Sequence, residues 1–205
     1  MFELFLEKLR IGLEKPLPGF KAHKSMIPDN REYKLTDENY TKSAVNIILY
    51  PNNGLENFIL TKRSSKMSHH SGQISLPGGK KDAVDKDLWE TAKRETLEET
   101  NIVIKDENYL GKLSPLLIPV SKFNVQPFIS VIDKKPDTPA RTNEVEKFFF
   151  VNISDFFSVD NFSKKTFFFN GKSFITPCYK LEGEIVWGAT AMILAEFSQI
   201  ILEFA

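Results

Sequence analysis

The segment Leu76–Ile102, LPGGKKDAVDKDLWETAKRETLEETNI, decides how this 205-residue chain is interpreted. It passes from a Pro-Gly-Gly turn through three aspartates into a run with helical spacing, in which Glu95, Glu98 and Glu99 share one small patch. Like charges three and four positions apart on a helix repel each other by roughly 0.2–0.5 kcal/mol per pair. The helix dipole adds a further cost for acids in the last turn. The segment therefore predicts a cationic partner for these carboxylates.

The predicted helix begins near Leu88 and ends near Thr100. Asp87 is followed three residues later by Glu90, which is the spacing of a capping box at a helix N-terminus. At the other end, Asn101 is the non-glycine residue type that best tolerates the left-handed conformation just past a helix. Both ends of the helix are therefore indicated by local signals.

The carboxylates of Glu95 and Glu99 continue a helical stripe that begins with the apolar residues Leu88 and Ala92. A helix that was merely solvated would place its acids opposite the apolar stripe. Arg94, four residues before Glu98, offers one counter-charge, which is too little for three carboxylates.

A hard divalent cation would neutralise all three glutamates. Oxygen ligands without histidine or cysteine favour Mg²⁺ or Mn²⁺ over zinc or copper. The alternative is an acidic helix with ordinary i,i+4 ion pairs. The glycines of the upstream turn favour the metal site, because glycine lets the backbone approach a ligand or a metal closely.

Composition limits the class of protein. Lys and Arg together number 27, as do Asp and Glu, and this balance argues against a protein that coats nucleic acid or an anionic membrane. One cysteine, Cys178, excludes an internal disulfide. No apolar run reaches the ~18 residues of a membrane span, and the charged N-terminus does not resemble a signal peptide. We expect a cytoplasmic protein of one domain, 1–205.

The rest of the chain predicts many strands and few helices, as in a mixed sheet covered by helices. An amphipathic helix is expected from Phe2 to Leu13, and residues 21–42 read as polar and irregular. Asn-Gly turns predict two hairpins, one around Asn53-Gly54 and one around Asn170-Gly171. The phenylalanine runs 148–150 and 167–169 are expected in the core. Further expected elements are short strands at QISL, PFISVI and VEKFFFVNI and a helix over Gly188–Phe204.

The spacing of the acidic segment resembles the Nudix box of Nudix hydrolases, a glycine, a spaced acid and then RExxEExG with an aliphatic residue. The gap from Gly79 to Arg94 is one residue longer than in the general box, and aspartates Asp82, Asp85 and Asp87 occupy it. This variant is similar to the coenzyme A pyrophosphatase branch. Residues that match the box directly are Arg94, Glu95, Glu98, Glu99 and Ile102.

A second motif, ILTKRSSKMSHHSGQISLPGG over Ile59–Gly79, resembles the signature found upstream of the box in coenzyme A pyrophosphatases. Ser68 stands where that signature has arginine, and Leu76 where it usually has phenylalanine. Asn101 replaces the glycine of the box. The likeness extends over most of the chain, with residues 1–43 as an N-terminal helix and extension and the box at about 79–102.

The resemblance implies an α/β/α sandwich with a mixed β-sheet that binds Mg²⁺ or Mn²⁺ and cleaves a diphosphate linked to a nucleoside. On coenzyme A the implied products are 3′,5′-ADP and 4′-phosphopantetheine. Two alternatives stay open: hydrolysis of another nucleoside diphosphate derivative such as ADP-ribose or NADH, and a catalytically silent nucleotide-binding module. The sequence leaves the oligomeric state open, a homodimer included.

The same resemblance assigns roles to individual residues. Glu95 and Glu99 are the first choice of metal ligands, with the Gly79 carbonyl as a backbone ligand and Glu98 as a further ligand or the general base. Arg94 orients the glutamates, and Glu144 is the alternative base, or an exposed acid at the start of a strand. His69 and His70 are substrate-loop residues or surface histidines. The full set expected to bind substrate is Arg63, Ser64, His69, His70, Gly72, Gln73 and Gly78.

Overall fold

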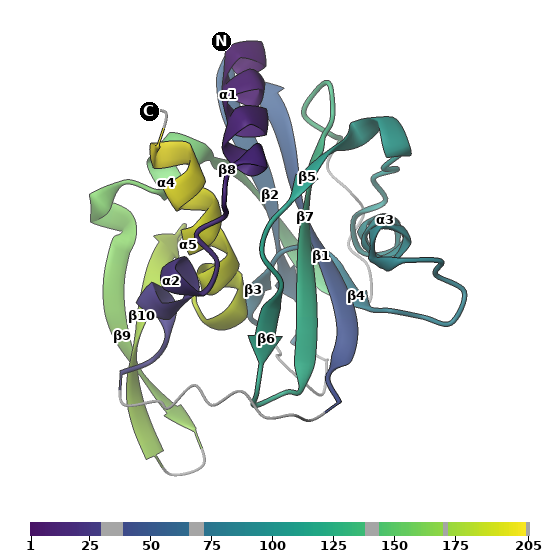
Figure 1. The fold of residues 1–205 in the computed structure, drawn as a ribbon. Coiled ribbons are helices and arrows are strands. Elements are labelled where there is room, and N and C mark those ends of the chain that lie inside the picture. Colours follow the sequence, from purple (N-terminus) through teal and green to yellow (C-terminus); the bar gives the residue numbers. More distant parts are fainter. Residues whose placement is uncertain (30–38, 66–71, 138–143, 170–171, 204–205) are drawn as a thin grey trace.

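The computed structural model describes residues 1–29, 39–65, 72–137, 144–169 and 172–203 (Figure 1). A mixed sheet lies at the centre, with helix α3 (Leu88–Thr100) on one face and helices α1 (Phe2–Glu14) and α5 (Gly188–Leu202) on the other. This is the predicted α/β/α arrangement. A second, three-stranded sheet lies beyond α5 and adds a further layer.

The main sheet has eight strands, and its central path runs in the order β3-β2-β1-β7-β5. Strands β1 and β7 pair in parallel, and the other pairings are antiparallel. Strand β4 also pairs with β1, β6 with β7 and β8 with β2. The strands are β1 (Thr41–Asn52), β2 (Leu55–Arg63), β3 (Ile74–Ser75), β4 (Gly78–Lys80), β5 (Tyr109–Lys112), β6 (Leu116–Ile118), β7 (Phe123–Val131) and β8 (Val145–Asn152).

The first hairpin forms as predicted. Asn53 and Gly54 join β1 to β2 with φ angles of 51° and 76°. Two successive positive φ angles match the right-handed twist of the flanking strands, which is why Asn-Gly is favoured there. Both strands carry apolar residues on both faces, because β1 and β2 lie between the helix layers. In β2, for example, Phe58 and Leu60 face α5, whereas Ile59 faces the α3 side.

The second hairpin also forms, but as a separate sheet with strand order β11-β10-β9. The aromatic side chains of this hairpin are not all buried in the core. Phe167 stacks on Trp187 with 4.4 Å between ring centroids, whereas Phe168 is 82% exposed. The expectation that this phenylalanine run is buried is therefore wrong for Phe168, because successive side chains of an outer strand point to opposite faces. The strands are β9 (Phe162–Phe169), β10 (Lys172–Leu181) and β11 (Glu184–Val186).

The segment after α1 is more ordered than predicted. Instead of an irregular stretch from residue 21, a short helix α2 (Phe20–His23) and a 3₁₀ turn η1 (Lys24–Met26) bury His23 and Met26 against α5. These elements escaped the sequence pattern because they are only one turn long. The remaining short elements are α4 (Ile153–Phe156), η2 (Asp106–Asn108) and η3 (Val159–Asn161).

Glu196 of α5 ties this N-terminal segment down. Its carboxylate is fully buried and accepts hydrogen bonds from the Gly19 amide at 3.0 Å and the Ser114 amide at 3.2 Å, and lies 3.0 Å from Nε2 of His23. Burial opposes ionisation, but the bonds from His23 and Ser114 outweigh it, so the pKa of Glu196 falls below its ordinary value.

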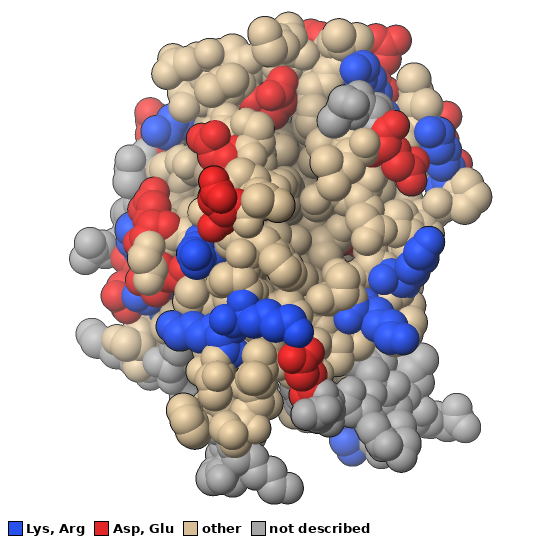
Figure 2. Space-filling model, turned by 90° about the vertical axis from the view of Figure 1, so that its left-hand side faces the viewer, with Lys and Arg blue, Asp and Glu red and all other residues tan. Residues whose placement is uncertain are grey.

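The surface carries mixed charge. On the face formed by the small sheet, Lys and Arg side chains lie among Asp and Glu side chains (Figure 2). One such pair joins Lys164 of β9 to Asp29 at 2.9 Å. Among the described residues, no helix has the length and apolar character needed to cross a membrane.

Candidate active site

Helix α3 begins and ends where its local signals predict. Asp87 Oδ1 accepts hydrogen bonds from the backbone amides of Trp89 at 2.8 Å and Glu90 at 2.9 Å. The carboxylate of Glu90 accepts from Lys93 instead of completing a capping box. Asn101 ends the helix in the left-handed conformation, with φ 56° and ψ 21°. The cap ends the helix directly after the turn that carries Glu98 and Glu99.

Asn101→Gly is expected to be neutral or mildly stabilising, whereas Asn101→Val should lower the free energy of unfolding by about 1 kcal/mol. Glycine enters the left-handed region without a Cβ penalty, and a β-branched residue does not. Urea unfolding of the two variants checks this. Equal stability of the glycine and valine variants would contradict the role of the cap.

The three glutamates occupy different environments on α3. Glu99 is 3% exposed and lies on the buried stripe with Ala92, Glu95 is half-buried, and the Glu98 side chain is 58% exposed. The predicted stripe of Leu88, Ala92, Glu95 and Glu99 is thus the face turned toward the sheet. A solvated acidic helix, the alternative from sequence, does not fit a buried Glu99.

The carboxylate of Glu99 is held from two sides. Its Oε2 accepts a hydrogen bond from the Gly78 amide at 3.1 Å, and its Oε1 lies 3.3 Å from Nη1 of Arg63. Burial, with a smaller effect of the negative charges of Glu95 and Glu144, raises the pKa of Glu99 to about 7 against the opposing effects of these two donors. The donors therefore compensate only part of the cost of burying this charge.

Glu95 lies against the glycine turn. A Cβ atom at Gly79 would lie 2.4 Å from the carboxylate carbon of Glu95, so the absence of a side chain there lets the backbone and the carboxylate come together. Burial raises the pKa of Glu95, while the hydrogen bond from Arg94 lowers it. The loop and the helix thus converge as the sequence suggested.

Alanine substitutions at Gly78 and Gly79 should affect different properties, stability at Gly78 and metal binding at Gly79. At Gly78, where φ is +155°, a Cβ would meet the Ala44 carbonyl oxygen of β1 at 2.3 Å, so Gly78→Ala should destabilise the protein by roughly 2 kcal/mol or more. At Gly79 the obstacle is the end of the Glu95 side chain, which can rotate away, so Gly79→Ala should leave the melting temperature within a few degrees and still disrupt metal binding. Thermal melts and Mn²⁺ titrations measure both. Equal melting temperatures for the two variants would refute the distinction.

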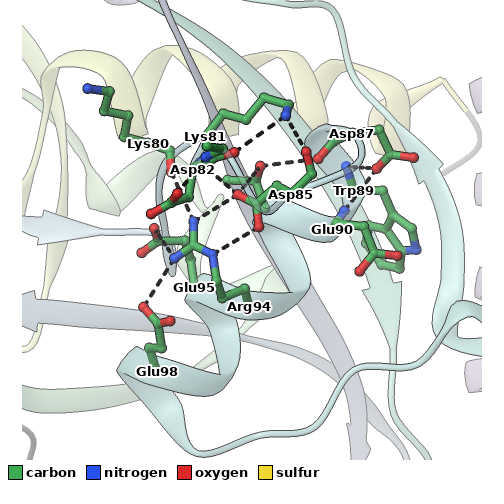
Figure 3. Close-up of polar contacts among 12 residues, drawn as sticks. Lys80, Lys81, Asp82, Asp85, Asp87, Trp89, Glu90, Arg94, Glu95 and Glu98 are labelled. Carbon is green, nitrogen blue, oxygen red and sulfur yellow. Dashed lines mark hydrogen bonds and ion pairs between the residues drawn. The ribbon is translucent and has the colours of Figure 1, made fainter.

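Arg94 is the hub of the polar network on this helix (Figure 3). Its Nη1 donates to Glu95 at 2.7 Å and to Glu98 at 3.2 Å, so the expected hydrogen bonds to the glutamates are present. Its Nε and Nη2 each donate to the carboxylate of Asp85 at 3.0 Å, and Nη2 also reaches the Lys80 carbonyl oxygen. The guanidinium joins the loop after β4 to the helix.

Asp85 is the contact that sequence reasoning missed. It is 6% exposed and accepts further hydrogen bonds from the Asp82 amide at 2.8 Å and the Thr91 hydroxyl at 2.9 Å. The bonds from Arg94 hold the pKa of Asp85 well below its usual range, although burial opposes this. The signal was visible as three aspartates in the gap of the box, and the spacing to Glu90 assigns Asp87 to the helix cap, but nothing local distinguishes Asp85 from Asp82.

Four of the candidate substrate residues, Arg63, Ser64, Gly72 and Gln73, meet at the end of β2, whereas Gly78 lies in β4 and donates to Glu99. The Arg63 amide donates to the Gln73 carbonyl oxygen at 3.0 Å, the Gly72 amide donates to the Arg63 carbonyl oxygen at 3.2 Å, and the Ser64 amide donates to the Glu144 carbonyl oxygen at 2.7 Å. The structure thus brings the backbone of Glu144 beside Ser64. The negative charge of Glu144 raises the pKa of Glu95 and of Glu99. His69 and His70, together with Ser68, lie outside the described residues. The assigned roles stay predictions.

The donor set fits a hard divalent cation. Glu95 and Glu99 are carboxylates whose pKa values are raised by burial and by the negative charges of neighbouring glutamates, and they lie against a turn whose backbone no side chain obstructs. In the part of the chain that is described, no three acidic, histidine or cysteine side chains are yet gathered as closely as metal ligands. Glu95 and Glu98 contact Arg94 instead, and Glu99 contacts Arg63.

The comparisons with known proteins agree with this geometry. The NUDIX domain model matches residues 40–175. The uncharacterized Nudix hydrolase NudL of Photorhabdus laumondii is 30% identical over 141 residues, which cover 69% of this chain and 75% of that protein. NudL of Yersinia pestis (strain Pestoides F) is 29% identical over 141 residues, covering 69% and 70%.

A solved structure supports the fold. The MutT/nudix family protein from Enterococcus faecalis superposes with a TM-score of 0.58 at 15% identity, covering 96% of this chain and 73% of that one. The family model covers more than half of the chain, and it includes the glycine turn, Arg94 and the glutamates of α3. The chain therefore belongs to the Nudix hydrolase family, whose members act on diphosphate-bearing substrates with divalent metal ions.

Proposed function

We propose that this protein is a metal-dependent coenzyme A diphosphatase. The observation that supports the metal site is the pair Glu95 and Glu99, one half-buried and one buried against the Gly78-Gly79 turn, whose pKa values are raised in spite of their arginine contacts. The branch rests on the resemblance of Ile59–Gly79 to the coenzyme A pyrophosphatase signature, part of which lies outside the described residues.

Glu95, Glu99 and the Gly79 carbonyl are the proposed ligands of Mg²⁺ or Mn²⁺, with Glu98 as a further ligand. The bound metal would neutralise the diphosphate and so permit attack by water at phosphorus. Arg94 keeps Glu95 and Glu98 in place through its two Nη1 contacts, while Asp85 fixes the guanidinium from the other side.

The general base is assigned to Glu144 in preference to Glu98. Glu98 is engaged by Arg94 at 3.2 Å on the exposed side of the helix. Glu144 is exposed, and its negative charge raises the pKa of both Glu95 and Glu99, which supports a position within electrostatic reach of the proposed metal ligands. A base in this position would accept a proton from the attacking water.

Incubation of the purified protein with coenzyme A, ADP-ribose and NADH, each with Mg²⁺ and with EDTA, tests the proposal by separation of the products. We expect 3′,5′-ADP and 4′-phosphopantetheine from coenzyme A, and no product in EDTA. Rapid cleavage of ADP-ribose or NADH with coenzyme A untouched would assign a different nucleoside diphosphate substrate. Binding without hydrolysis of any of the three would favour a silent module.

A further inference from the structure

The contact between Arg63 and Glu99 places a side-chain cation where the proposed metal would bind. Nη1 of Arg63 lies 3.3 Å from Oε1 of Glu99, and the Gly78 amide donates to the other oxygen of the same carboxylate. The Glu99 side chain is 4% exposed and the Arg63 side chain 23% exposed, so the pair lies at the edge of the site with the arginine on the solvent side.

Hydrogen bonds hold the backbone of Arg63 in place, whereas its side chain contacts Glu99. Its amide and carbonyl groups bond to Gln73 and Gly72, and the next amide, that of Ser64, bonds to the Glu144 carbonyl oxygen. The ladder between β2 and β8 shifts register between Lys62 and Arg63, as at a β-bulge. A move of the guanidinium away from Glu99 therefore needs side-chain rotation alone.

The neighbouring lysine does not share this position. Lys62 belongs to the opposite face of β2, where its Nζ lies 2.6 Å from Oε1 of Glu184 in β11. Arg63 and Lys62 are thus adjacent in sequence, carry the same charge and face different layers of the molecule. This makes Lys62 a matched control for any effect of charge alone.

We propose that Arg63 holds the place of the divalent cation at Glu99 in the metal-free protein, and that metal binding displaces it toward the diphosphate of the substrate. This inference rests on the proposed metal-dependent hydrolysis. A cation coordinated by Oε1 of Glu99 would lie within ion-pair distance of the guanidinium, and two positive charges repel strongly at this partly buried position. The released guanidinium has the planar fork that suits phosphate oxygens.

The exchange makes metal and substrate binding cooperative. Before substrate binds, the metal must displace Arg63 from Glu99, which weakens metal affinity. Once a diphosphate is present, the displaced arginine has a new anionic partner and the opposition disappears. Arg63 is therefore a residue that links the metal site to the substrate, in addition to its expected contact with substrate.

Mn²⁺ titration of the substrate-free protein, followed by electron paramagnetic resonance, tests the exchange. Arg63→Met removes the competing charge at similar length and should tighten Mn²⁺ binding by about tenfold, while lowering kcat/KM. Arg63→Lys should stay close to the wild type in Mn²⁺ affinity, and Lys62→Met should leave it unchanged. Thermal melts in EDTA establish that each variant is folded.

Equal or weaker Mn²⁺ binding by Arg63→Met would overturn the exchange, as would an equal tightening in Lys62→Met. These outcomes are separate from the fate of the proposed substrate. If the wild type binds Mn²⁺ but leaves coenzyme A intact, the coenzyme A assignment fails, and the comparison of Mn²⁺ affinities still decides whether Arg63 competes with the metal.

Discussion

Glu99→Gln is expected to lower kcat/KM by about 10²–10³-fold and to abolish the rise in melting temperature that Mg²⁺ gives the wild-type protein. The substitution keeps the shape of the side chain and an oxygen that can accept the Gly78 hydrogen bond. It removes the negative charge that a divalent cation needs. Loss of catalysis should therefore occur without loss of the fold.

The metal-free variant should be as stable as the wild type, or more stable. Burial raises the pKa of Glu99 to about 7, which means that the folded protein bears a cost for ionising this carboxylate. Glutamine removes that cost. Melting curves in EDTA and in Mg²⁺ measure both effects, with Glu90→Gln at the start of the same helix as control. A variant that retains full Mg²⁺ stabilisation would show that Glu99 is no metal ligand.

Asp85→Asn is expected to lower the free energy of unfolding by about 2–3 kcal/mol at pH 7 and to reduce activity through misplacement of Arg94. Asp85 accepts four hydrogen bonds, and two of them come from one guanidinium that also holds Glu95 and Glu98. An amide cannot accept both bonds from Arg94. Asp82→Asn, at an exposed position of the same loop, is the control and should be nearly neutral.

The effect of Asp85→Asn should depend on pH. Hydrogen bonds from Arg94 lower the pKa of Asp85 in the folded protein below the unfolded value of about 3.9. A group whose folded pKa is depressed stabilises the protein above its unfolded pKa, and this stabilisation is lost as pH falls toward the folded pKa. The stability gap between wild type and variant should thus be full at pH 7 and smaller by about 1 kcal/mol at pH 3. Urea titrations at both pH values measure this difference in free energy of unfolding. A difference that stayed constant would show that the charge of Asp85 does not stabilise the fold.

Local signals predicted the elements that depend on local chemistry. The bounds of α3 followed from Asp87 and Asn101, and the first hairpin followed from Asn53-Gly54, because caps and tight turns are determined by a few adjacent residues. Strands β5 and β6 were missed. They are short and are stabilised by pairing with β7, which no local pattern reveals.

The sequence predicted which residues form the site, but not how exposed each one is or which side chain it contacts. Three glutamates of one helix differ in exposure because the sheet covers Glu99 and leaves Glu98 in solvent, and this depends on tertiary packing. The contact of Arg63 with Glu99 spans 36 positions, so sequence spacing could not pair them. The choice of Asp85 among three aspartates depends on the path of the loop in the same way.

The buried carboxylate of Glu196 has a consequence for the order in which the chain assembles on the ribosome. Its partners Gly19 and His23 precede it by 177 and 173 positions, so they are synthesised and emerge well before their acceptor exists. Closing so long a loop carries an entropic cost that local contacts do not repay in advance. The N-terminal helices can therefore dock onto α5 only after every strand of both sheets has been translated, and this contact should be among the last to form.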